Sequence, residues 1–471
     1  MTEPEAQHAF EPFAAKMKAA GISAAAIAAF RRSYLQLASG QTGKIPESAI
    51  EPVEALPVVG SSVPGPKRVK KLLSHTCLLK LNGGLGTSMG MNGAKSLLPL
   101  KDGLSFLDLI CRQVLHLRNE HGPIQFLLMD SFNTSAETQE LITRAYSGLG
   151  MPGEWEMIQN KVPKVDAKTL APAAWPQEPD LEWCPPGHGD LYSVLVGGGR
   201  LDALLAMEIR YLFVSNSDNL GATLDLAILD QFSSLGSPFL MEVTQRTQAD
   251  KKGGHLCRDR EKGNLRLRES AQCPSEDMDA FQDIEKHRFF NTNNLWINLY
   301  QLKKELARQD GVIPLPAIFN SKTLDPRDKE TPKVIQLETA MGAAIESFPG
   351  SMAIEVPRTR FLPVKTTNDL LGLRSDAYEV TPDSSLRLRD GLTEAPLVDL
   401  DAAHYKFIDD LTDLFGTGAP SLKRCRSFTV KGKLRFPHQG VEIVGDALLV
   451  NKGGEEKTVP PGVYADGTFE F

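Results

Sequence analysis

The first part of the chain follows the periodicity of an amphipathic helix. Ile27, Phe30, Tyr34 and Leu37 recur at spacings of three and four residues, which places them on one face of a helix. The alanines between them favour helix. The stretch that follows contains many prolines and is basic at positions 67–71, so we expect a solvated loop there. We therefore predict an N-terminal helical segment over residues 1–65.

From residue 76 onward, short apolar runs alternate with segments of helical length. The apolar runs lie at 77–81, 124–129, 211–215, 239–243 and 295–299, and the helical segments include 106–119 and 137–147. This alternation predicts an α/β fold in which a mostly parallel sheet carries helices on both faces. Ligands of such sheets bind beyond the carboxyl ends of the strands, so the site is expected in those loops. We assign this domain to residues 66–377.

The pattern changes again after residue 377. Short β-rich runs appear at 428–430, 433–436, 441–444 and 448–450. The expected turns between them lie at Gly432, Gly440, Gly445 and Gly453. Evenly spaced short strands predict a small all-β module, with a solenoid among the candidates, over residues 378–471.

Composition excludes several classes of protein. The chain of 471 residues carries 52 basic and 59 acidic side chains, and this net charge of −7 argues against general binding to nucleic acids or anionic membranes. The six cysteines form no Cys-x-x-Cys pair, which argues against a zinc site and fits a reducing compartment. We find neither a signal-peptide pattern nor an apolar run of about 18 residues, so we expect a soluble, cytoplasmic protein.

The glycines cluster directly after the predicted strand at 78–81. The string reads Asn82-Gly-Gly-Leu-Gly-Thr-Ser-Met-Gly90 and continues through Gly93 to Lys95. Backbone N–H groups of such a loop can form a nest for phosphate oxygens, and a lysine can add a compact positive charge. The string fits neither GxxxxGK[ST] nor GxGxxG, and on this evidence alone a tight turn without a ligand remains an alternative.

The longer string from Leu81 to Lys95 resembles the signature of the eukaryotic-type UTP–glucose-1-phosphate uridylyltransferase (UDP-glucose pyrophosphorylase) family. Further segments that match follow in a consistent order. They lie at 128–134, 184–190, 215–222, 249–254, 290–296, 336–340 and 360–367. The resemblance implies a Rossmann-like, glycosyltransferase-A-like central domain, an N-terminal helical segment and a C-terminal left-handed β-helix.

The reaction implied by the resemblance is UTP + glucose 1-phosphate ⇌ UDP-glucose + pyrophosphate, with Mg²⁺ as cofactor. The sugar phosphate is itself the nucleophile at the α-phosphorus of UTP. The protein must therefore align two polyanions and neutralise the charge that develops between them. The implied partners are these small molecules, and a homo-oligomer is possible because the family assembles through its C-terminal module.

The resemblance also implies roles for individual residues. Lys95 and Lys365 are the expected catalytic residues, and both are expected to contact the nucleotide. The other nucleotide-binding positions are Leu81, Asn82, Gly83, Gly84, Met129, Gln159, Gly187 and Asp218. The sugar-binding positions are His188, Asn216, Glu269, Asn291 and Asn293.

Residue chemistry is compatible with two roles that the resemblance implies, namely a metal ligand at Asp218 and a uracil contact at Gln159. Asp218 comes just after a predicted strand, where a carboxylate can hold Mg²⁺, with a helix cap or Asx turn as the alternative. The side-chain amide of Gln159 can donate and accept at once, so it can read a pyrimidine edge.

The sequence departs from the family pattern at three places. The C-terminal module is shorter than is usual in the family, which leaves the assembly state open. Ala94 stands where a proline commonly precedes the lysine, so the loop loses some rigidity. Basic and acidic residues are interleaved over 250–268, with Arg266 and Arg268 among them, which predicts a solvated hairpin instead of a nucleic-acid patch.

Two other functions remain open on the sequence. The chain could be a uridylyltransferase for another sugar 1-phosphate, such as galactose 1-phosphate, or a catalytically idle nucleotide-sugar binding protein. The presence of Lys95, Asp218 and Lys365 argues against the idle protein, because binding alone places fewer demands on phosphate and metal groups.

Overall fold

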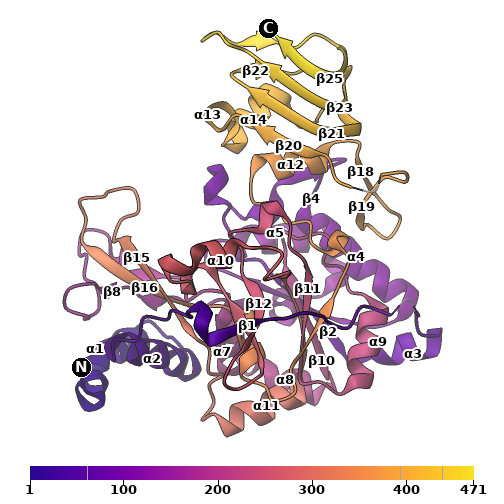
Figure 1. Cartoon of the computed structure of the whole chain (residues 1–471). Coiled ribbons are helices and arrows are strands. Elements are labelled where there is room, and N and C mark those ends of the chain that lie inside the picture. The colour runs from indigo at the N-terminus through magenta and orange to yellow at the C-terminus, as the bar shows by residue number, and fades with distance from the viewer. Residues whose placement is uncertain (61, 393, 438) are drawn as a thin grey trace.

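A ten-stranded mixed sheet lies at the centre of the computed structural model, which describes residues 1–60, 62–392, 394–437 and 439–471 (Figure 1). Its main path runs through β1 (Ile50–Pro52), β12 (His255–Asp259), β14 (Phe289–Asn298), β10 (Tyr211–Asn216), β2 (Thr76–Leu81), β5 (Gln125–Asp130) and β6 (Glu156–Ile158). Three further strands join at the side, namely β11 (Phe239–Gln245), β13 (Leu265–Arg268) and β17 (Met352–Glu355). Strands β10, β2, β5 and β6 are parallel, whereas β14 is antiparallel to β10 and β11.

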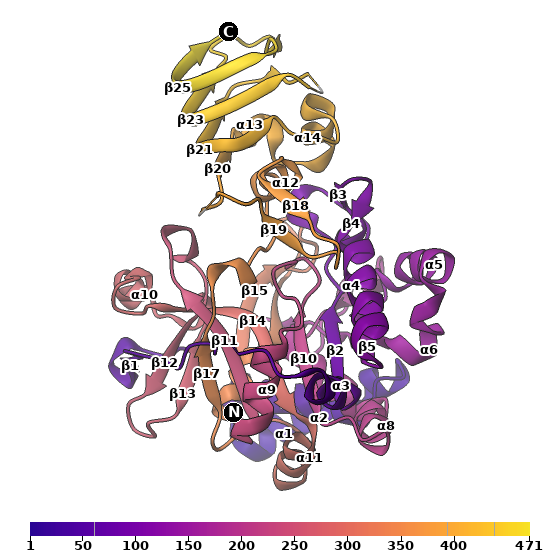
Figure 2. The same ribbon diagram turned by 90° about the vertical axis from the view of Figure 1, so that its right-hand side faces the viewer.

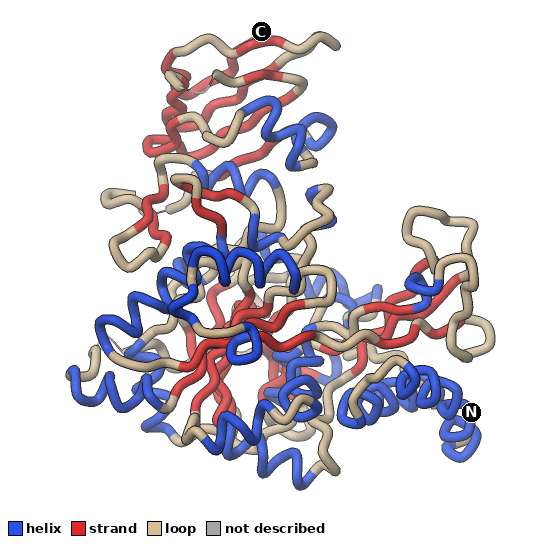
Figure 3. Tube along the Cα trace, turned by 180° about the vertical axis from the view of Figure 1, so that it is seen from behind, coloured by secondary structure: helices blue, strands red, loops and turns tan. Residues whose placement is uncertain are grey.

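Helices cover both faces of this sheet, as the sequence predicts (Figure 3). Leu78 and Leu79 are neighbours in β2 but belong to two different hydrophobic clusters, because successive side chains of a strand point to opposite faces. One cluster contains apolar residues of α3 (Pro66–Ser74), α4 (Phe106–His121) and α9 (Leu226–Leu235). The other contains those of α7 (Leu191–Gly197), α8 (Arg200–Ala206) and α11 (Leu299–Arg308).

The basic stretch at 67–71 is a helix, so the predicted loop is wrong at this point. Pro66 begins α3 at a position where its missing N–H costs no hydrogen bond. Val69, Leu72 and Leu73 lie on one helical face and are buried, while the lysines between them remain on the solvent side. The apolar spacing was present in the sequence, but the charges masked it.

The N-terminal helices pack as a pair against a small antiparallel sheet. The predicted helix around Phe30 is confirmed as α2 (Ala24–Ala38), and it is preceded by α1 (Glu3–Ala19). Phe10, Phe13, Phe30 and Tyr34 form an aromatic cluster, with 4.8 Å between the ring centres of Phe13 and Tyr34. The small sheet beside them contains β15 (Ala317–Thr323), β16 (Lys333–Thr339) and β8 (Val165–Asp166).

The C-terminal module stacks parallel strands above the central domain (Figure 2). A four-stranded sheet contains β20 (Leu397–Leu400), β21 (Ser421–Lys431), β23 (Val441–Val450) and β25 (Gly462–Glu470), and β22 (Leu434–Arg435) pairs with β24 (Lys457–Thr458). The predicted turn at Gly445 is wrong, because this residue lies within β23 at a shift of register. The left-handed β-helix stays a prediction, as do the three domain boundaries.

The remaining elements connect these parts. The helices are α5 (Ser135–Ala145), α6 (Pro152–Trp155), α10 (Met278–Gln282), α12 (Thr367–Arg374), α13 (Ala402–Tyr405) and α14 (Ile408–Phe415). The short strands are β3 (Pro99–Lys101), β4 (Leu104–Ser105), β7 (Val162–Pro163), β9 (Trp183–Cys184), β18 (Tyr378–Val380) and β19 (Leu386–Leu388). Within the described residues, none of the helices has the length and apolar character needed to cross a bilayer.

Residues 250–268 do contain a hairpin, formed by β12 and β13, but the hairpin is only partly solvated. Arg268 is fully buried, and its guanidinium contacts Glu47 at 2.6 Å and Asp277 at 3.4 Å. Glu47 comes from a distant part of the chain, 221 residues away, and the expectation of a solvated Arg268 is wrong. The six cysteines are all buried and free.

Candidate active site

Three of the predicted site residues lie side by side at the carboxyl edge of the sheet. In the register of the parallel strands, Leu81 at the end of β2 is paired with Asn216 of β10 and with Met129 of β5. The loops that follow these strands therefore leave the sheet at the same level. This is the place where an α/β sheet binds its ligands.

Asn82 holds the start of the glycine-rich loop in place through buried hydrogen bonds. Its side chain is buried, and Nδ2 donates to Asp130 Oδ1 at 2.7 Å and to Thr138 Oγ1 at 3.0 Å. Its backbone N–H donates to Met129 O at 2.7 Å. Burial raises the pKa of Asp130 to about 7, although the hydrogen bond from Asn82 acts in the opposite direction. Sequence reasoning assigned Asn82 to the nucleotide and missed its bond to Asp130.

The glycine-rich loop folds back on itself above the strand ends. Gly86 and Gly90 have φ values of 66° and 78°, a conformation that other residues rarely adopt. The N–H of Lys95 donates to Gly84 O at 3.0 Å and closes the loop. A side chain on Gly90 would meet the ring of Phe407 at 2.9 Å, so the C-terminal module contacts this loop directly.

Lys95 and Asp218 form an ion pair at the mouth of the site. Lys95 Nζ lies 2.5 Å from Asp218 Oδ2, and the two side chains are only 13% and 23% exposed. The structure thus joins a predicted phosphate ligand to the predicted metal ligand. A phosphate that binds Lys95 must compete with Asp218, and a cation that binds Asp218 must compete with Lys95.

Lys365 stands at the opposite side of the same site with an exposed side chain. Its backbone N–H donates to Asp369 Oδ2 at 2.8 Å, and the Ser88 hydroxyl of the glycine-rich loop donates to its carbonyl at 3.4 Å. The N–H of the preceding Val364 donates to Asp218 O at 3.1 Å. The main chain of Lys365 is therefore fixed, and the residue lines a cavity of about 320 Å³ that the C-terminal module also lines.

A buried ion pair holds the segment that carries Lys365. Arg360 donates from Nε and Nη2 to the two carboxylate oxygens of Glu242, at 2.7 and 2.8 Å. Trp296 Nε1 and Asn294 Nδ2 also donate to this carboxylate, at 2.8 and 3.0 Å. Glu242 is fully buried in β11 and Arg360 nearly so. Sequence reasoning missed Glu242, although a lone acid in an apolar run was a usable signal.

Lys80 is a second buried charge that sequence reasoning missed. This β2 residue is 2% exposed, and its Nζ donates to Ser215 Oγ at 2.8 Å and to Ala222 O at 2.7 Å. Burial lowers the pKa of Lys80 to about 7, and the positive charge of Arg360 acts in the same direction. The residue ties the end of β2 to the loop that begins after β10.

The residues expected near the uracil base of the nucleotide form a second group, around Gln159. The Gln159 N–H donates to Asp130 O at 2.7 Å, and Nε2 donates to Gly187 O at 3.0 Å. Gly187 has a φ of 79°, and a side chain there would lie 2.5 Å from Thr339 O, so only glycine fits. His188 Nδ1 accepts the Met341 N–H at 3.0 Å, and burial lowers the pKa of His188 to about 4, so this ring is neutral and carries its proton on Nε2.

The remaining sugar-binding candidates lie on β14 and after β13. Asn291 Nδ2 donates to Asn293 Oδ1 at 2.9 Å, and Asn293 N–H donates to Asn291 Oδ1 at 3.0 Å. Asn293 has a φ of 60° in a bulge, where the register between β11 and β14 shifts. Glu269 lies against Gly254, and burial raises its pKa while the charge of Lys365 opposes this shift.

The amino-acid sequence is similar to those of known proteins. A family model described as UTP–glucose-1-phosphate uridylyltransferase matches residues 27–442. A protein of that name from Encephalitozoon cuniculi is 40% identical over 406 residues, which cover 85% of this chain and 79% of the relative.

Solved structures are similar over nearly the whole chain. A variant of UDP-glucose pyrophosphorylase from Leishmania major, in complex with UDP-Glc, superimposes with a TM-score of 0.93 at 46% identity, covering 98% of this chain and 99% of the other. A Trypanosoma brucei structure described as UDP-glucose phosphorylase gives a TM-score of 0.89 at 44% identity, covering 98% and 100%.

Replacing Glu242 tests the buried ion pair. We expect Glu242→Ala to lower the free energy of unfolding by about 3–5 kcal/mol, because the buried Arg360 charge loses its bidentate partner and keeps only the longer contact with Asp225, at 3.8 Å. Urea denaturation measures the change. Glu379→Ala, which removes an acid from the exposed pair with Arg387, is the control and is expected to cost about 0–1 kcal/mol. A cost of Glu242→Ala no larger than that of the control would contradict the assignment.

Lys80 is expected to make stability depend on pH. The unfolded chain keeps the Lys80 proton up to about pH 10, whereas the folded chain loses it near pH 7, so the unfolded state binds more protons between these values. The contribution of Lys80 to the free energy of unfolding therefore increases with pH. Relative to Lys80→Met, the wild type should gain about 2 kcal/mol between pH 7 and pH 9, measured by urea unfolding. Lys457→Met, at an exposed lysine, should show no such difference; parallel curves for Lys80→Met would refute the prediction.

Proposed function

We propose a mechanism from the premise that the chain belongs to the UTP–glucose-1-phosphate uridylyltransferase family and is a nucleotidyltransferase. The reaction of this family joins UTP and glucose 1-phosphate to give UDP-glucose and pyrophosphate. One observation carries the assignment of the site. Lys95, Asp218 and Lys365 come together around a glycine-rich loop at the carboxyl edge of the parallel strands.

We infer a single in-line displacement. An oxygen of the sugar phosphate forms a bond to the α-phosphorus of UTP, and the bond from that phosphorus to the bridging oxygen of the β-phosphate breaks. The electron pair leaves with pyrophosphate, so atoms and charge balance without a protein nucleophile. The chain contributes by holding both anions in line and by stabilising the charge of the transition state.

The two lysines supply most of this stabilisation. In our proposal, Lys95 leaves Asp218 when the polyphosphate arrives, and the backbone N–H groups from Gly83 onward receive phosphate oxygens. Gly84 supports this role, because no atom lies within 4 Å of where a side chain would start, so a ligand has room above it. Lys365 lies against the α-phosphate and the sugar phosphate. Its fixed main chain means that only the side chain has to be ordered on binding.

Asp218 fits a magnesium site of the kind that substrates complete. Mg²⁺ takes one or two carboxylates together with phosphate oxygens and waters. Asp218 offers one partly exposed carboxylate at a strand end, and no cluster of three or more histidine, cysteine or acidic ligands occurs in the described part of the chain. When bound, Mg²⁺ would neutralise phosphate charge at this edge of the site. Lys95 would then be released from Asp218 to the nucleotide.

The other site residues read the two substrates. Gln159 Nε2 donates one N–H to Gly187 O, so its second N–H and its Oε1 remain for hydrogen bonds to the uracil edge. Leu81, Asn82, Met129 and Gly187 shape the nucleotide side. For glucose we propose His188, Asn216, Glu269, Asn291 and Asn293. The paired amides of Asn291 and Asn293 are held rigidly, which suits them to hydroxyl groups.

We also propose that residues 378–471 form a left-handed β-helix. The parallel pairing of β20, β21, β23 and β25 supports a coil in which each strand lies above the previous one. Assembly into a homo-oligomer through this module remains a prediction.

The reaction itself is tested by release of pyrophosphate. Purified protein with UTP, Mg²⁺ and glucose 1-phosphate is expected to release pyrophosphate, and addition of EDTA is expected to stop the release. Galactose 1-phosphate and N-acetylglucosamine 1-phosphate are tested in parallel, and a lower kcat/KM is expected for both. Faster turnover of another sugar would overturn the assignment to glucose, and the absence of release with every sugar would overturn the enzymatic function.

Lys365→Ala tests the catalytic lysine. We expect kcat to fall by at least about 10²–10³-fold, as when one group that stabilises transition-state charge is removed. The melting temperature should stay unchanged, because this side chain is exposed. Lys457→Ala removes an exposed lysine of the C-terminal module and serves as the matched control. A kcat near that of the wild type would show that the catalytic charge is supplied elsewhere.

A further inference from the structure

Asp190 is a buried carboxylate that the proposed mechanism does not use. It is 6% exposed, and no cationic group among the described residues lies within 4.0 Å of its oxygens. Its oxygens accept hydrogen bonds from Asn160 N–H at 2.7 Å, from Asn160 Nδ2 at 3.0 and 3.1 Å, and from the Ser193 hydroxyl. Burying a carboxylate is costly unless its hydrogen bonds are satisfied, and here uncharged donors alone satisfy them.

The start of a helix does not account for this carboxylate. Asp190 is the N-cap residue of α7, yet its side chain caps none of the helical N–H groups. Both oxygens are directed to Asn160, a residue 30 positions earlier in the chain. Apart from the hydroxyl of Ser193 in α7, the hydrogen bonds of the carboxylate therefore serve the contact between two segments.

Asp190 and Gln159 join the same two segments. Asn160 directly follows Gln159, and Asp190 follows Gly187 by three residues. One bond runs from Gln159 Nε2 to Gly187 O, and the others run from Asn160 to Asp190. The segments cannot slide past each other without breaking both contacts.

The hydrogen bond from Gln159 Nε2 to Gly187 O also fixes the orientation of the Gln159 amide group. Nε2 is held by Gly187 O, and Oε1 lies toward Gly83, where an added side chain would be 3.1 Å from it. Uracil presents an N3–H donor next to carbonyl acceptors, whereas cytosine presents an N3 acceptor next to an amino donor. An amide that is free to rotate can match either base, but one held in this orientation matches only one of them.

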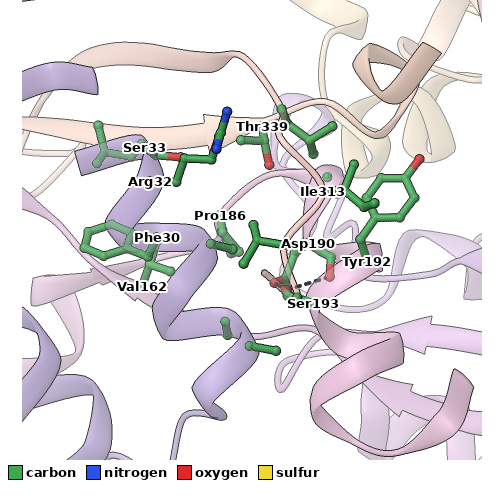
Figure 4. Close-up of a pocket in the computed structure, with 18 of the residues that line it drawn as sticks. Phe30, Arg32, Ser33, Val162, Pro186, Asp190, Tyr192, Ser193, Ile313 and Thr339 are labelled. Carbon is green, nitrogen blue, oxygen red and sulfur yellow. Dashed lines mark hydrogen bonds between the residues drawn. The ribbon is translucent and has the colours of Figure 1, made fainter. Parts of the chain in front are cut away.

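The surroundings of Asp190 offer no substitute for Asn160. Behind it lies a small cavity of about 50 Å³ between α2 and α7, whose walls include Phe30, Val162 and Ile313 (Figure 4). Arg32 lines the same cavity but makes no ion pair with Asp190. Loss of the contact with Asn160 would leave the carboxylate facing mostly apolar groups.

We propose that Asp190 is a positioning residue that sets selectivity for the base, by holding Asn160 and with it the amide of Gln159. This inference rests on the proposed role of Gln159 in reading uracil. Asp190 contacts no substrate in this scheme. It acts through the geometry of the two segments.

The ratio of kcat/KM for UTP to that for CTP, with glucose 1-phosphate saturating, is the measurement. For Asp190→Ala we expect this ratio to fall at least tenfold, mainly through a higher KM for UTP, with kcat within about threefold of the wild type. Asp190→Asn keeps one oxygen for the Asn160 N–H and should recover part of the ratio. Ser193→Ala removes a donor from the same carboxylate on the α7 side and should keep the ratio of the wild type.

Three further results decide between the inference and its premise. Asn160→Ala leaves Asp190 intact and should lower the ratio, which covers the case in which Asp190→Ala does not fold. If Gln159→Ala keeps the ratio, the premise that Gln159 reads the base is wrong. If Gln159→Ala lowers it while Asp190→Asn and Asn160→Ala both keep it, the inference is wrong and the premise stands.

Discussion

Glu242 and Arg360 meet at the central sheet, where Glu242 is fully buried and Arg360 is nearly so. Removing either partner would leave a buried charge, so the chain is committed to this contact once it folds. Arg360 begins the segment that ends at Lys365, and Asn219 bonds to the same segment through Arg360 O and the Leu362 N–H. The position of Lys365, the lysine that we propose as catalytic, thus depends on a buried ion pair at the start of its own segment.

The same arrangement explains how an acidic chain can receive two polyanions. The net charge is −7, but the charges around the site are organised in layers. Buried pairs such as Glu242 with Arg360 are neutral as units, and Lys80 lies near its point of deprotonation. Of the two lysines, Lys365 is exposed, whereas Lys95 is largely buried and is balanced by Asp218.

The C-terminal module is part of this arrangement. Phe407 packs on Gly90 of the glycine-rich loop, and α12, which follows Lys365 directly, bonds to the module through Thr367 and Asn368. Both lysine-bearing segments therefore contact the module.

The sequence by itself determined the local features of this protein. Strand and helix periodicity located α2, β2, β5 and β10, because side-chain direction repeats every 3.6 or 2 residues. The glycine-rich string identified the loop, since positive φ at Gly86 and Gly90 is a property of single residues. Residue types in the matching motifs are the basis for assigning the two lysines and Asp218 to the site, and that assignment stays a prediction. These features depend on residues that are close together in the chain, and the sequence gives those residues directly.

Only the tertiary structure decided which polar groups are buried together. Arg268 looked solvated until Glu47 and Asp277 appeared beside it, and the charges on α3 concealed a helix whose other face is buried. Glu242 finds Arg360 at a separation of 118 residues, and Asp190 finds Asn160 at 30. Whether a charge is paired or exposed depends on which distant segments the sheet brings to the same edge. That choice is made by packing of the whole chain, so periodicity and local motifs do not contain it.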